Sequence, residues 1–521
     1  MLIAVAANPA LAQVEGRFDI FEFVVEGNTV LSAEAIEQAV YPLLGPQRTA
    51  DDVNAAAAAL EKAYQDAGYL TVAVGIPEQS TSSGAIVLQV TEGKVDRLRV
   101  TGAEYTLPSA LREAAPALAE GAVPHFTEVQ EELTRLGGAD LQVTPLLQPG
   151  RVPGSVNVEL RVDDKSPFHG SVELNNKRSA DTETGRLEAS LRYDNLWQRR
   201  HSIGLAYFSS PRNRDEVEVF GLNYAAPLGK GILAAFYARS NSNIPTQFDI
   251  ASLGRGETYG MRYVLPLPDR NLGVYHSISV GLDYKDNEQD TVLLGSTPFT
   301  LSQPVKYWVM SAQYGLNIPV AAATKLRFGT TLSAGSTAMN EKLIECNGSR
   351  LEQFACRRGG ATPGFLVARF EVEGSYGFAG GWLASARTDI QRSSDPLINS
   401  EQFSAGGADS VRGYLESERL GDEGERVRLE LATPGRPLFS DAFVASGLLF
   451  YDWAGLRIRQ AVTGQDPRAS LESVGLGLRV TSPRGIRVHA DWALALRDGA
   501  SGNGRTREGD QRLLLKVAYE F

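Results

Sequence analysis

Residues 166–521 of this 521-residue chain alternate apolar and polar side chains in one segment after another. Residues 486–496 show the pattern clearly, with one apolar face (Ile486, Val488, Ala490, Trp492, Leu494, Leu496) and one polar face (Arg487, His489, Asp491). Such period-two alternation predicts β-strands. A soluble sandwich would alternate in the same way. Charge on one face of many successive strands, together with aromatic strand ends, favours a transmembrane β-barrel around a water-filled lumen.

The connections between these segments alternate in length. Short ones fall near residues 195–199, 229–231, 379–381 and 483–485, and long ones near 286–304, 339–364, 395–424 and 500–510. Bacterial barrels have an even number of antiparallel strands with short periplasmic turns and long outer loops, and we count about sixteen segments here. The last segment ends on Tyr519 and Phe521, which we interpret as a membrane-insertion signal read by the barrel assembly machinery.

The composition agrees with a β-rich membrane protein. A net charge of −11 argues against general binding of nucleic acid. No run reaches the roughly 18 to 20 apolar residues of a transmembrane helix. The 52 glycines, with 20 Phe, 18 Tyr and 5 Trp, suit tight turns and aromatic girdles. A membrane barrel can have a low mean hydropathy, because only alternate residues of its strands face the lipid.

The first residues resemble the end of a secretory signal. A short apolar run leads to Ala10-Leu11-Ala12, which has the small-residue pattern of a cleavage site. We therefore expect residues 1–12 to be the remnant of a signal peptide. The alternative is a frayed terminus.

The chain has two cysteines, Cys346 and Cys356, within one long loop rich in glycine and arginine. A closely spaced, even pair in an exported protein predicts a disulfide. A metal site is not expected, because no histidine or second cysteine pair lies near in sequence.

Before the barrel, residues 18–165 carry a mixed pattern that occurs twice. Residues 18–93 read as strand, helix, helix, strand, strand, and residues 95–162 repeat that order. Ser32 is expected to cap one helix, and capping boxes are expected at Thr49 with Asp52 and at Thr127 with Gln130. Two copies of about 75 residues predict a tandem array of small α+β domains.

These units resemble POTRA domains. Gly68-Tyr69, Ile76-Pro77-Glu78-Gln79 and residues 86–93 resemble the first POTRA of two-partner secretion transporters, the haemolysin and filamentous haemagglutinin secretion family of the POTRA-barrel superfamily. Pro149-Gly150 and Pro153-Gly154 resemble the last hairpin of the second POTRA. The resemblance implies capture of an unfolded client by strand addition to an open sheet edge, which unpaired backbone groups permit. The alternative is a pair of spacer domains without client contact.

The resemblance continues into the barrel. Leu174-Asn175-Asn176, Ser179 and Thr184-Gly185 resemble the first hairpin of the same transporters. Val411-Arg412-Gly413-Tyr414 then belongs to a loop, around residues 395–425, that folds into the pore in this family. The family's wall motif F-x-D-x-G corresponds to Phe450, Asp452 and Ala454, so its last position departs from the pattern.

This resemblance implies an anchor inside the pore. Phe450, Asp452 and Ala454 share one strand face, opposite to Tyr451 and Trp453, so the acid is expected to face inward. We expect Arg412 to pair bidentately with Asp452, Gly413 to shape the backbone and Tyr414 to pack beside them. The alternative for Arg412 is an ordinary solvated loop arginine.

No pattern indicates catalysis or a cofactor. Five histidines (His125, His169, His201, His276, His489) are scattered without ligand spacing, and no nucleophile elbow or phosphate loop occurs in its required context. His489 beside Asp491 is interpreted as wall lining of the lumen. We therefore expect neither an enzyme nor a metal or soluble cofactor.

The sequence predicts an outer-membrane transporter of the two-partner secretion type. We expect POTRA 1 at residues 13–93, POTRA 2 at 94–165 and the barrel at 166–521, with the POTRA domains in the periplasm and outer-membrane lipid around the barrel. The expected client is a large adhesin- or haemolysin-like exoprotein. A pore-plugging helix is not expected, because few residues separate Gln13 from the first strand. The alternatives are an insertase of the same superfamily, a passive porin or a surface-attached binding module.

Overall fold

The computed structural model describes residues 16–138, 140–180, 182–241, 255–269, 273–287, 290–293, 299–321, 324–346, 348–439, 442–462, 465–500 and 505–521. The chain forms two compact units, Met1–Pro167 and Phe168–Phe521. The expected signal remnant at residues 1–12 lies outside the described residues. Within the described ranges, no helix combines the length and the apolar character needed to cross a membrane.

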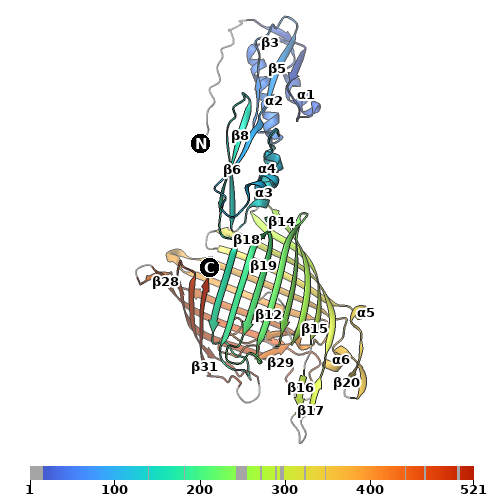
Figure 1. The fold of residues 1–521 in the computed structure, drawn as a ribbon, viewed down its shortest axis with the longest axis vertical. Helices are drawn as coiled ribbons and strands as arrows, with labels where there is room; N and C mark the ends of the chain where they lie inside the picture. The colour runs from blue at the N-terminus through green and yellow to red at the C-terminus, as the bar shows by residue number, and fades with distance from the viewer. Residues whose placement is uncertain are drawn as a thin grey trace. The chain divides into compact units, whose positions relative to one another are not determined.

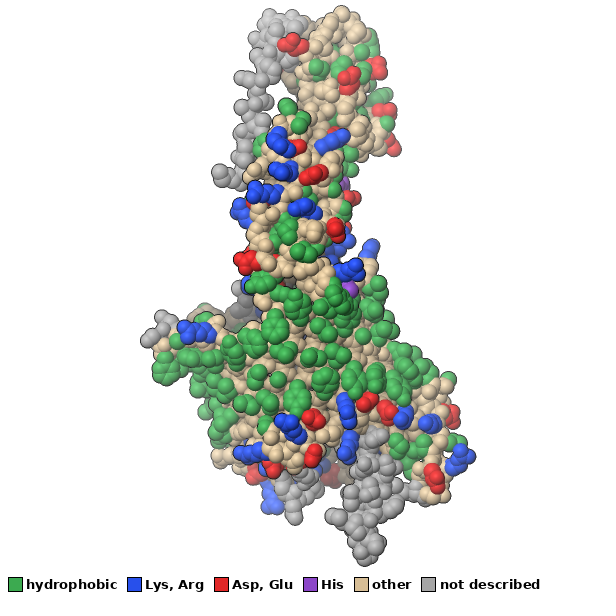
Figure 2. Space-filling model, viewed as in Figure 1, with side chains coloured by type: hydrophobic (Ala, Val, Ile, Leu, Met, Phe, Trp, Pro, Cys, Tyr) green, Lys and Arg blue, Asp and Glu red, His purple; other side chains and the backbone are tan. Residues whose placement is uncertain are grey.

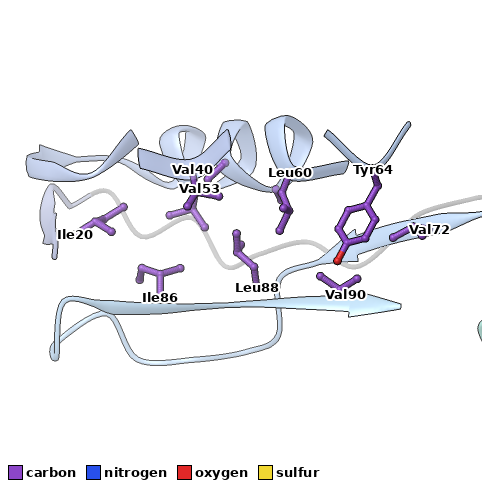
Figure 3. Close-up of a cluster of buried hydrophobic side chains, with 11 residues drawn as sticks. Ile20, Val40, Val53, Leu60, Tyr64, Val72, Ile86, Leu88 and Val90 are labelled. Carbon is purple, nitrogen blue, oxygen red and sulfur yellow. The ribbon is translucent and has the colours of Figure 1, made fainter. Parts of the chain in front are cut away.

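The first unit begins with an α+β domain whose helices cover one face of a three-stranded sheet. Strand β5 lies in the centre, parallel to β2 and antiparallel to β4. Alternate residues of β5 (Ile86, Leu88 and Val90) point at the helices and are buried against Leu60 and Tyr64 (Figure 3). The elements are β1 (Phe18–Ile20), β2 (Glu22–Glu26), α1 (Ala33–Val40), β3 (Gly45–Arg48), α2 (Ala50–Asp66), β4 (Val72–Gly75) and β5 (Ala85–Glu92).

A second α+β domain repeats this topology. Its sheet has the order β6-β8-β7, with β6 parallel to the central β8 and β7 antiparallel to it. Its own core includes Leu98, Leu111, Leu136 and Leu160. The elements are β6 (Lys94–Thr101), α3 (Pro108–Glu113), α4 (Phe126–Leu136), β7 (Leu141–Pro149) and β8 (Ser155–Asp164).

The last residue of the central strand has the same role in both domains. In the first, the carboxylate of Glu92 accepts the backbone N–H of Thr29 at 2.6 Å. In the second, Asp164 accepts the N–H groups of residues 104, 105 and 106 at 2.8, 3.0 and 2.7 Å. Each acid thus satisfies backbone donors of the loop that precedes the first helix. The two domains therefore share a hydrogen-bonding acid as well as a topology, and the hydrophobic pattern does not reveal that acid.

Two of the three predicted helix caps are confirmed. Ser32 accepts the N–H of Ala35, and Thr49 and Asp52 form the capping box of α2. The expected box at Thr127 is wrong, because α4 begins one residue earlier and its N-cap is His125. The Nδ1 atom of His125 accepts the N–H of Glu128 at 3.4 Å and so replaces a hydroxyl cap.

The second unit is a closed antiparallel barrel (Figure 1). Strand β26 and the short β27 pair with the same neighbour, β28, so the wall has sixteen strand positions, as predicted. The wall strands are β9 (Phe168–Asn175), β10 (Arg186–Leu196), β11 (His201–Ser209), β12 (Glu218–Leu228), β13 (Gly231–Ser240), β14 (Gly256–Asp269), β15 (Val274–Asn287), β18 (Val305–Ala321), β19 (Thr324–Gly335), β22 (Leu366–Gly377), β23 (Leu383–Ser393), β26 (Glu423–Ala432), β27 (Arg436–Leu438), β28 (Phe443–Arg457), β29 (Arg468–Thr481), β30 (Ile486–Ala495) and β31 (Gln511–Glu520).

The outside of the wall is apolar. Figure 2 shows a band of hydrophobic side chains over the barrel strands, with charged side chains gathered beyond one edge of the band. On β28, Asp452 is fully buried on the lumen side, whereas Leu449, on the opposite face, is 53% exposed. This outward apolar face is the membrane surface of a barrel.

The first and last strands close the wall. Strand β31 pairs with β9 from Lys516 opposite Asn175 to Glu520 opposite Ser171. Beyond that pairing, the side-chain amide of Asn176 accepts the N–H of Leu515 at 2.8 Å and donates to the carbonyl oxygen of Leu513 at 2.7 Å. The amide therefore continues the ladder after β9 has ended.

One outer loop, between β19 and β22, has a small fold of its own. Helix α5 (Thr337–Asn340), strands β20 (Leu343–Cys346) and β21 (Ser349–Glu352) and helix α6 (Gln353–Arg357) follow one another. Cys346 and Cys356 form a disulfide. Phe354 is buried in a cluster that also contains Tyr307 of β18 and Phe365, so the loop is packed onto the barrel rim. Another outer connection, between β15 and β18, contains a small hairpin of β16 (Asp290–Leu293) and β17 (Phe299–Ser302).

Candidate functional site: the loop in the barrel lumen

The segment at residues 395–425 contacts the inward face of the wall at several points, and its last three residues begin wall strand β26. It contains a two-stranded sheet of β24 (Phe403–Ala405) and β25 (Arg419–Gly421). Between these strands lies the Val411-Arg412-Gly413-Tyr414 motif. We call residues 395–425 the in-pore loop.

Arg412 is completely buried and pairs with Asp452 of β28. Its Nε and Nη2 atoms donate to the two carboxylate oxygens, both at 2.7 Å, and its backbone N–H donates to Oδ2 at 3.1 Å. Asp452 is also fully buried. A planar guanidinium matches the two carboxylate oxygens in one orientation, so the pair fixes direction as well as distance.

The remaining surroundings of Arg412 complete a balanced charge cluster. Its Nη1 lies 2.8 Å from a carboxylate oxygen of Glu430, and Arg428 Nε lies 3.6 Å from Asp452 Oδ1. The guanidinium carbon lies 3.5 Å from the centre of the Phe450 ring. A third acid, Asp491, lies 3.8 Å from Nη1 of Arg412 and is itself paired with Arg479, so three arginines and three acids meet beside the aromatic ring. Buried charges persist only when they are paired in this way.

Gly413 brings the loop backbone close to the wall. Its φ of +93° is a conformation that residues with a side chain rarely adopt. A Cβ there would lie 3.4 Å from Cβ of Ala493 on β30. Its carbonyl oxygen accepts Nε of Arg512 at 2.9 Å, so β31 also holds this turn.

Tyr414 and Val411 pack on either side of the charged pair. The Tyr414 hydroxyl donates to the carbonyl oxygens of Glu472 at 3.0 Å and Arg497 at 2.7 Å. Both side chains belong to a buried cluster that includes Ala454. Ala454, which departs from the family's glycine, is fully buried there, so its methyl group is accommodated.

A second anchor, which sequence reasoning missed, holds the end of the in-pore loop. Asp422 is fully buried and accepts both Nη atoms of Arg358, one of them at 2.7 Å. It also accepts the backbone N–H of Leu397 at 2.9 Å and of Arg459 at 2.7 Å. Arg358 lies two residues after Cys356. The disulfide loop is thereby joined to the base of the in-pore loop.

A third contact lies at the start of the loop. Glu401 is almost fully buried and lies 2.6 Å from Nζ of Lys285 on β15. It also accepts the hydroxyl of Tyr307 at 2.8 Å. Polar wall residues therefore hold the in-pore loop at its tip and its start, and Arg358 of the disulfide loop holds it at its base.

The structure brings most of the predicted site residues together. Val411, Arg412, Gly413 and Tyr414 meet Phe450, Asp452 and Ala454 in one place, and Cys346 is bonded to Cys356. Tyr519 and Phe521 lie elsewhere, at the closing seam, where Phe521 exchanges backbone hydrogen bonds with Gly170 at 2.9 and 3.0 Å. The sequence does not indicate the pairing of Asp422 with Arg358, because Asp422 is a single acid before a strand and Arg358 lies 64 residues away.

A sixteen-stranded outer-membrane barrel that follows POTRA domains and holds a clamped loop in its lumen defines a transporter of the POTRA-barrel superfamily. Residues 18–93 match the family "POTRA domain, ShlB-type", and residues 154–290 and 358–480 match "Haemolysin secretion/activation protein ShlB/FhaC/HecB". The chain belongs to this family, the outer-membrane transporters of two-partner secretion. Its POTRA domains lie in the periplasm, and its function is the secretion of a partner protein across the outer membrane.

Known proteins agree with this assignment. The outer membrane transporter CdiB of Escherichia coli is 26% identical over 443 residues, which cover 80% of this chain and 69% of CdiB. The hemolysin transporter protein ShlB of Serratia marcescens is 25% identical over 542 residues, or 100% of this chain and 89% of ShlB.

Solved structures share the fold. That of CdiB from Escherichia coli has a TM-score of 0.64 at 18% identity and covers 99% of this chain and 93% of that one. BamA from Haemophilus ducreyi lacking POTRA domains 1–3 has a TM-score of 0.53 at 14% identity, over 97% of this chain and 100% of that one.

Proposed function

We propose that this transporter exports one large adhesin- or haemolysin-like exoprotein, which its POTRA domains capture in an unfolded state. The domain assignment that we propose is POTRA 1 at residues 13–93, POTRA 2 at 94–165 and the barrel at 166–521. The observation that carries the proposal is the charged anchor of the in-pore loop, Arg412 with Asp452. It gives the lumen a fixed internal element around which an extended chain passes. Tyr519 and Phe521 are proposed as the signal that the barrel assembly machinery reads.

The sheet edges decide where a client strand adds. Edge strand β4 has the N–H of Val74 bonded to Glu61 at 3.2 Å, and edge strand β6 has the N–H of Leu98 bonded to Glu120 at 3.3 Å. Edge strand β7 contains Pro145 and Pro149, which lack donors. Such features protect edges against strand pairing.

Strand β2 (Glu22–Glu26) has no such protection. Within the described residues, only β5 pairs with it in a sheet, and the side-chain amide that donates to the carbonyl oxygen of Glu26, that of Gln89, belongs to β5 itself. Phe21, just before it, is 71% exposed and offers an apolar contact. We infer that the client adds as a strand to the free edge of β2.

Cysteine cross-linking tests this docking edge. Both native cysteines are in a disulfide, so Glu22→Cys introduces one free thiol on β2. We expect it to form a disulfide with clients that carry single cysteines. Gln142→Cys on the proline-containing edge β7 is the matched control and should not react. Equal cross-linking at both positions would show that β2 is not the docking edge.

A comparison of secreted and membrane proteins tests the transport itself. Deleting the gene should remove one large protein from the culture supernatant and leave other barrels intact. Arg412→Ala or Asp452→Ala should impair that secretion while the barrel still inserts, because each removes the bidentate pair that fixes the tip of the in-pore loop. General loss of outer-membrane barrels would instead indicate an insertase. Wild-type secretion by both variants would exclude the anchor's role.

A further inference from the structure

The outer wall carries a cluster of arginines around a hollow. Arg392, Arg457 and Arg468 line a cavity of about 540 Å³ on β23, β28 and β29. Arg457 and Arg468 lie directly opposite each other on adjacent strands. Like charges in that position destabilise a sheet unless a counter-charge is present.

The protein's own acids only partly supply that counter-charge. Glu425 lies 3.2 Å from Arg392, and Glu423 lies 3.7 Å from Arg457 while it also pairs with Arg459. Among the residues that the structure describes, Arg468 has no acidic partner. The hollow therefore keeps an excess of positive charge next to open solvent.

The arginines face outward at the level of the outer lipid headgroups. Asp452, Ala454 and Leu456 of β28 are buried on the lumen side, so Arg457 points the other way. With the POTRA domains in the periplasm, β9 runs outward, and so does β28, an even number of antiparallel steps later. Trp453 lies on the same outer face, roughly 13 Å along the strand from Arg457. Aromatic residues mark the membrane interface, so Arg457 lies just beyond it.

An apolar groove begins on the same strands near the middle of the membrane and continues across β22, β19 and β18 towards their periplasmic ends, where Tyr376, Lys325 and Val320 line it. It measures about 780 Å³, and its lining includes Ala384 and Ala386 of β23, Leu429 of β26, Leu449 and Tyr451 of β28 and Val474 of β29. The two alanines leave room between the larger side chains. Ala386 and Arg392 are roughly 20 Å apart along a tilted strand, comparable with the ~15 Å of hydrocarbon in one leaflet.

We propose that β23, β26, β28 and β29 form a binding site for a phosphorylated lipid of the outer leaflet. The phosphate occupies the hollow between Arg457 and Arg468, and the end of an acyl chain reaches the near end of the groove, at Ala386 and Tyr451. Arginine binds phosphate bidentately, and a bound phosphate removes the repulsion between the two side chains. The opposite face of β28 carries Asp452, so the lipid braces the wall that holds the in-pore loop.

Native mass spectrometry of the full chain in detergent tests the site. The probe is a bis-phosphorylated, acylated disaccharide lipid, and its dephosphorylated form is the lipid control. We expect one bound copy of the phosphorylated probe. Binding by Arg457→Gln with Arg468→Gln should be about a hundredfold weaker, since two charge-assisted contacts are lost and each costs about a factor of ten. Arg350→Gln with Arg484→Gln removes the same charge from exposed positions elsewhere and should bind normally.

A groove variant tests the second half of the site. Ala386→Phe fills the groove without a change of charge and should weaken binding of the phosphorylated probe. Normal binding by Arg457→Gln with Arg468→Gln, or equal binding of the dephosphorylated lipid, would overturn the proposal. So would efficient displacement by inorganic phosphate, which would indicate a site for a free anion.

Discussion

Arg412 owes its role to the shape of its side chain as much as to its charge. Three separate nitrogens reach Asp452 and Glu430, while the face of the group lies on Phe450. Lysine offers a single ammonium, which cannot repeat this set of contacts. Removing one partner of a buried pair costs about 3–5 kcal/mol, and a lysine recovers only part of that.

We therefore expect Arg412→Lys to loosen the in-pore loop without unfolding the barrel. In planar bilayers the channel should show larger and more variable conductance, since the tip of the loop is no longer fixed in the lumen. Arg419→Lys is the matched control, because Nη2 of Arg419 donates to one carbonyl oxygen, that of Gly499, at 2.6 Å, and a lysine can replace that bond. If Arg412→Lys conducts like the wild type, charge alone suffices at this position.

The structure places Arg412 against Asp452, the pair to which a loop motif and a strand parity both pointed. The alternation around Asp452 placed that carboxylate inward, and a known loop motif supplied Arg412. The same reasoning missed Arg358 and Asp422, because an ordinary outer-loop arginine and an ordinary turn acid gave no sign that they meet. An ion pair that forms between two loops when the chain folds has no periodic pattern in the sequence from which it could be predicted.

At the scale of elements, the two POTRA domains share a device for ending the central strand. Burial raises the pKa of Asp164, but hydrogen bonds from residues 104–106 outweigh it, so the net shift in the pKa is downward. A carboxyl whose folded pKa is lowered stabilises the fold above its unfolded pKa. That contribution is lost as the pH falls through the folded pKa.

Asp164→Asn should accordingly reduce the free energy of unfolding at pH 7 by about 1–3 kcal/mol. Residues 16–167 contain both domains and their cores, so urea denaturation of this segment measures the effect. The difference from the wild type should begin to shrink near pH 4, where the carboxyl of the unfolded chain becomes protonated, and should disappear as the pH falls through the lowered pKa of the folded carboxyl. Asp163→Asn, at the exposed neighbouring position, is the control. A pH-independent difference would mean that the charge of Asp164 is not responsible.

Element prediction gave the helices and the three-stranded sheets of both domains in the right order, missed the small β1–β3 sheet, and was weaker at element ends. The first helix expected in the second repeat is α3 followed by a separate short turn, Pro116–Leu118, because Pro116 interrupts the helical hydrogen bonds. The cap of α4 was misplaced because a histidine at position 125 performs what a hydroxyl usually does. Local propensity gives such boundaries only when the usual residue types are used.

At the scale of the whole barrel, the in-pore loop is held by the wall and by another outer loop. Arg358 donates to Asp422 and also to the carbonyl oxygen of Arg459 at 3.1 Å, so it joins three outer connections. Its position depends on α6, which the disulfide ties to β20 and which Phe354 packs onto the rim. The alternation of strands predicted the wall, but it carried no information about how loops join above it.

We expect this arrangement to make the in-pore loop sensitive to reduction. Replacing both Cys346 and Cys356 by serine removes a constraint worth about 2–3 kcal/mol and lets α6 move. Conductance fluctuations should rise in the same direction as for Arg358→Gln, but less, because Phe354 still packs. A reductant added on the outer side should reproduce the effect in the wild type and change nothing further in the double-serine variant. If the reductant acts equally on both proteins, or on neither, the disulfide does not control the loop, and the base anchor relies on Phe354 packing alone.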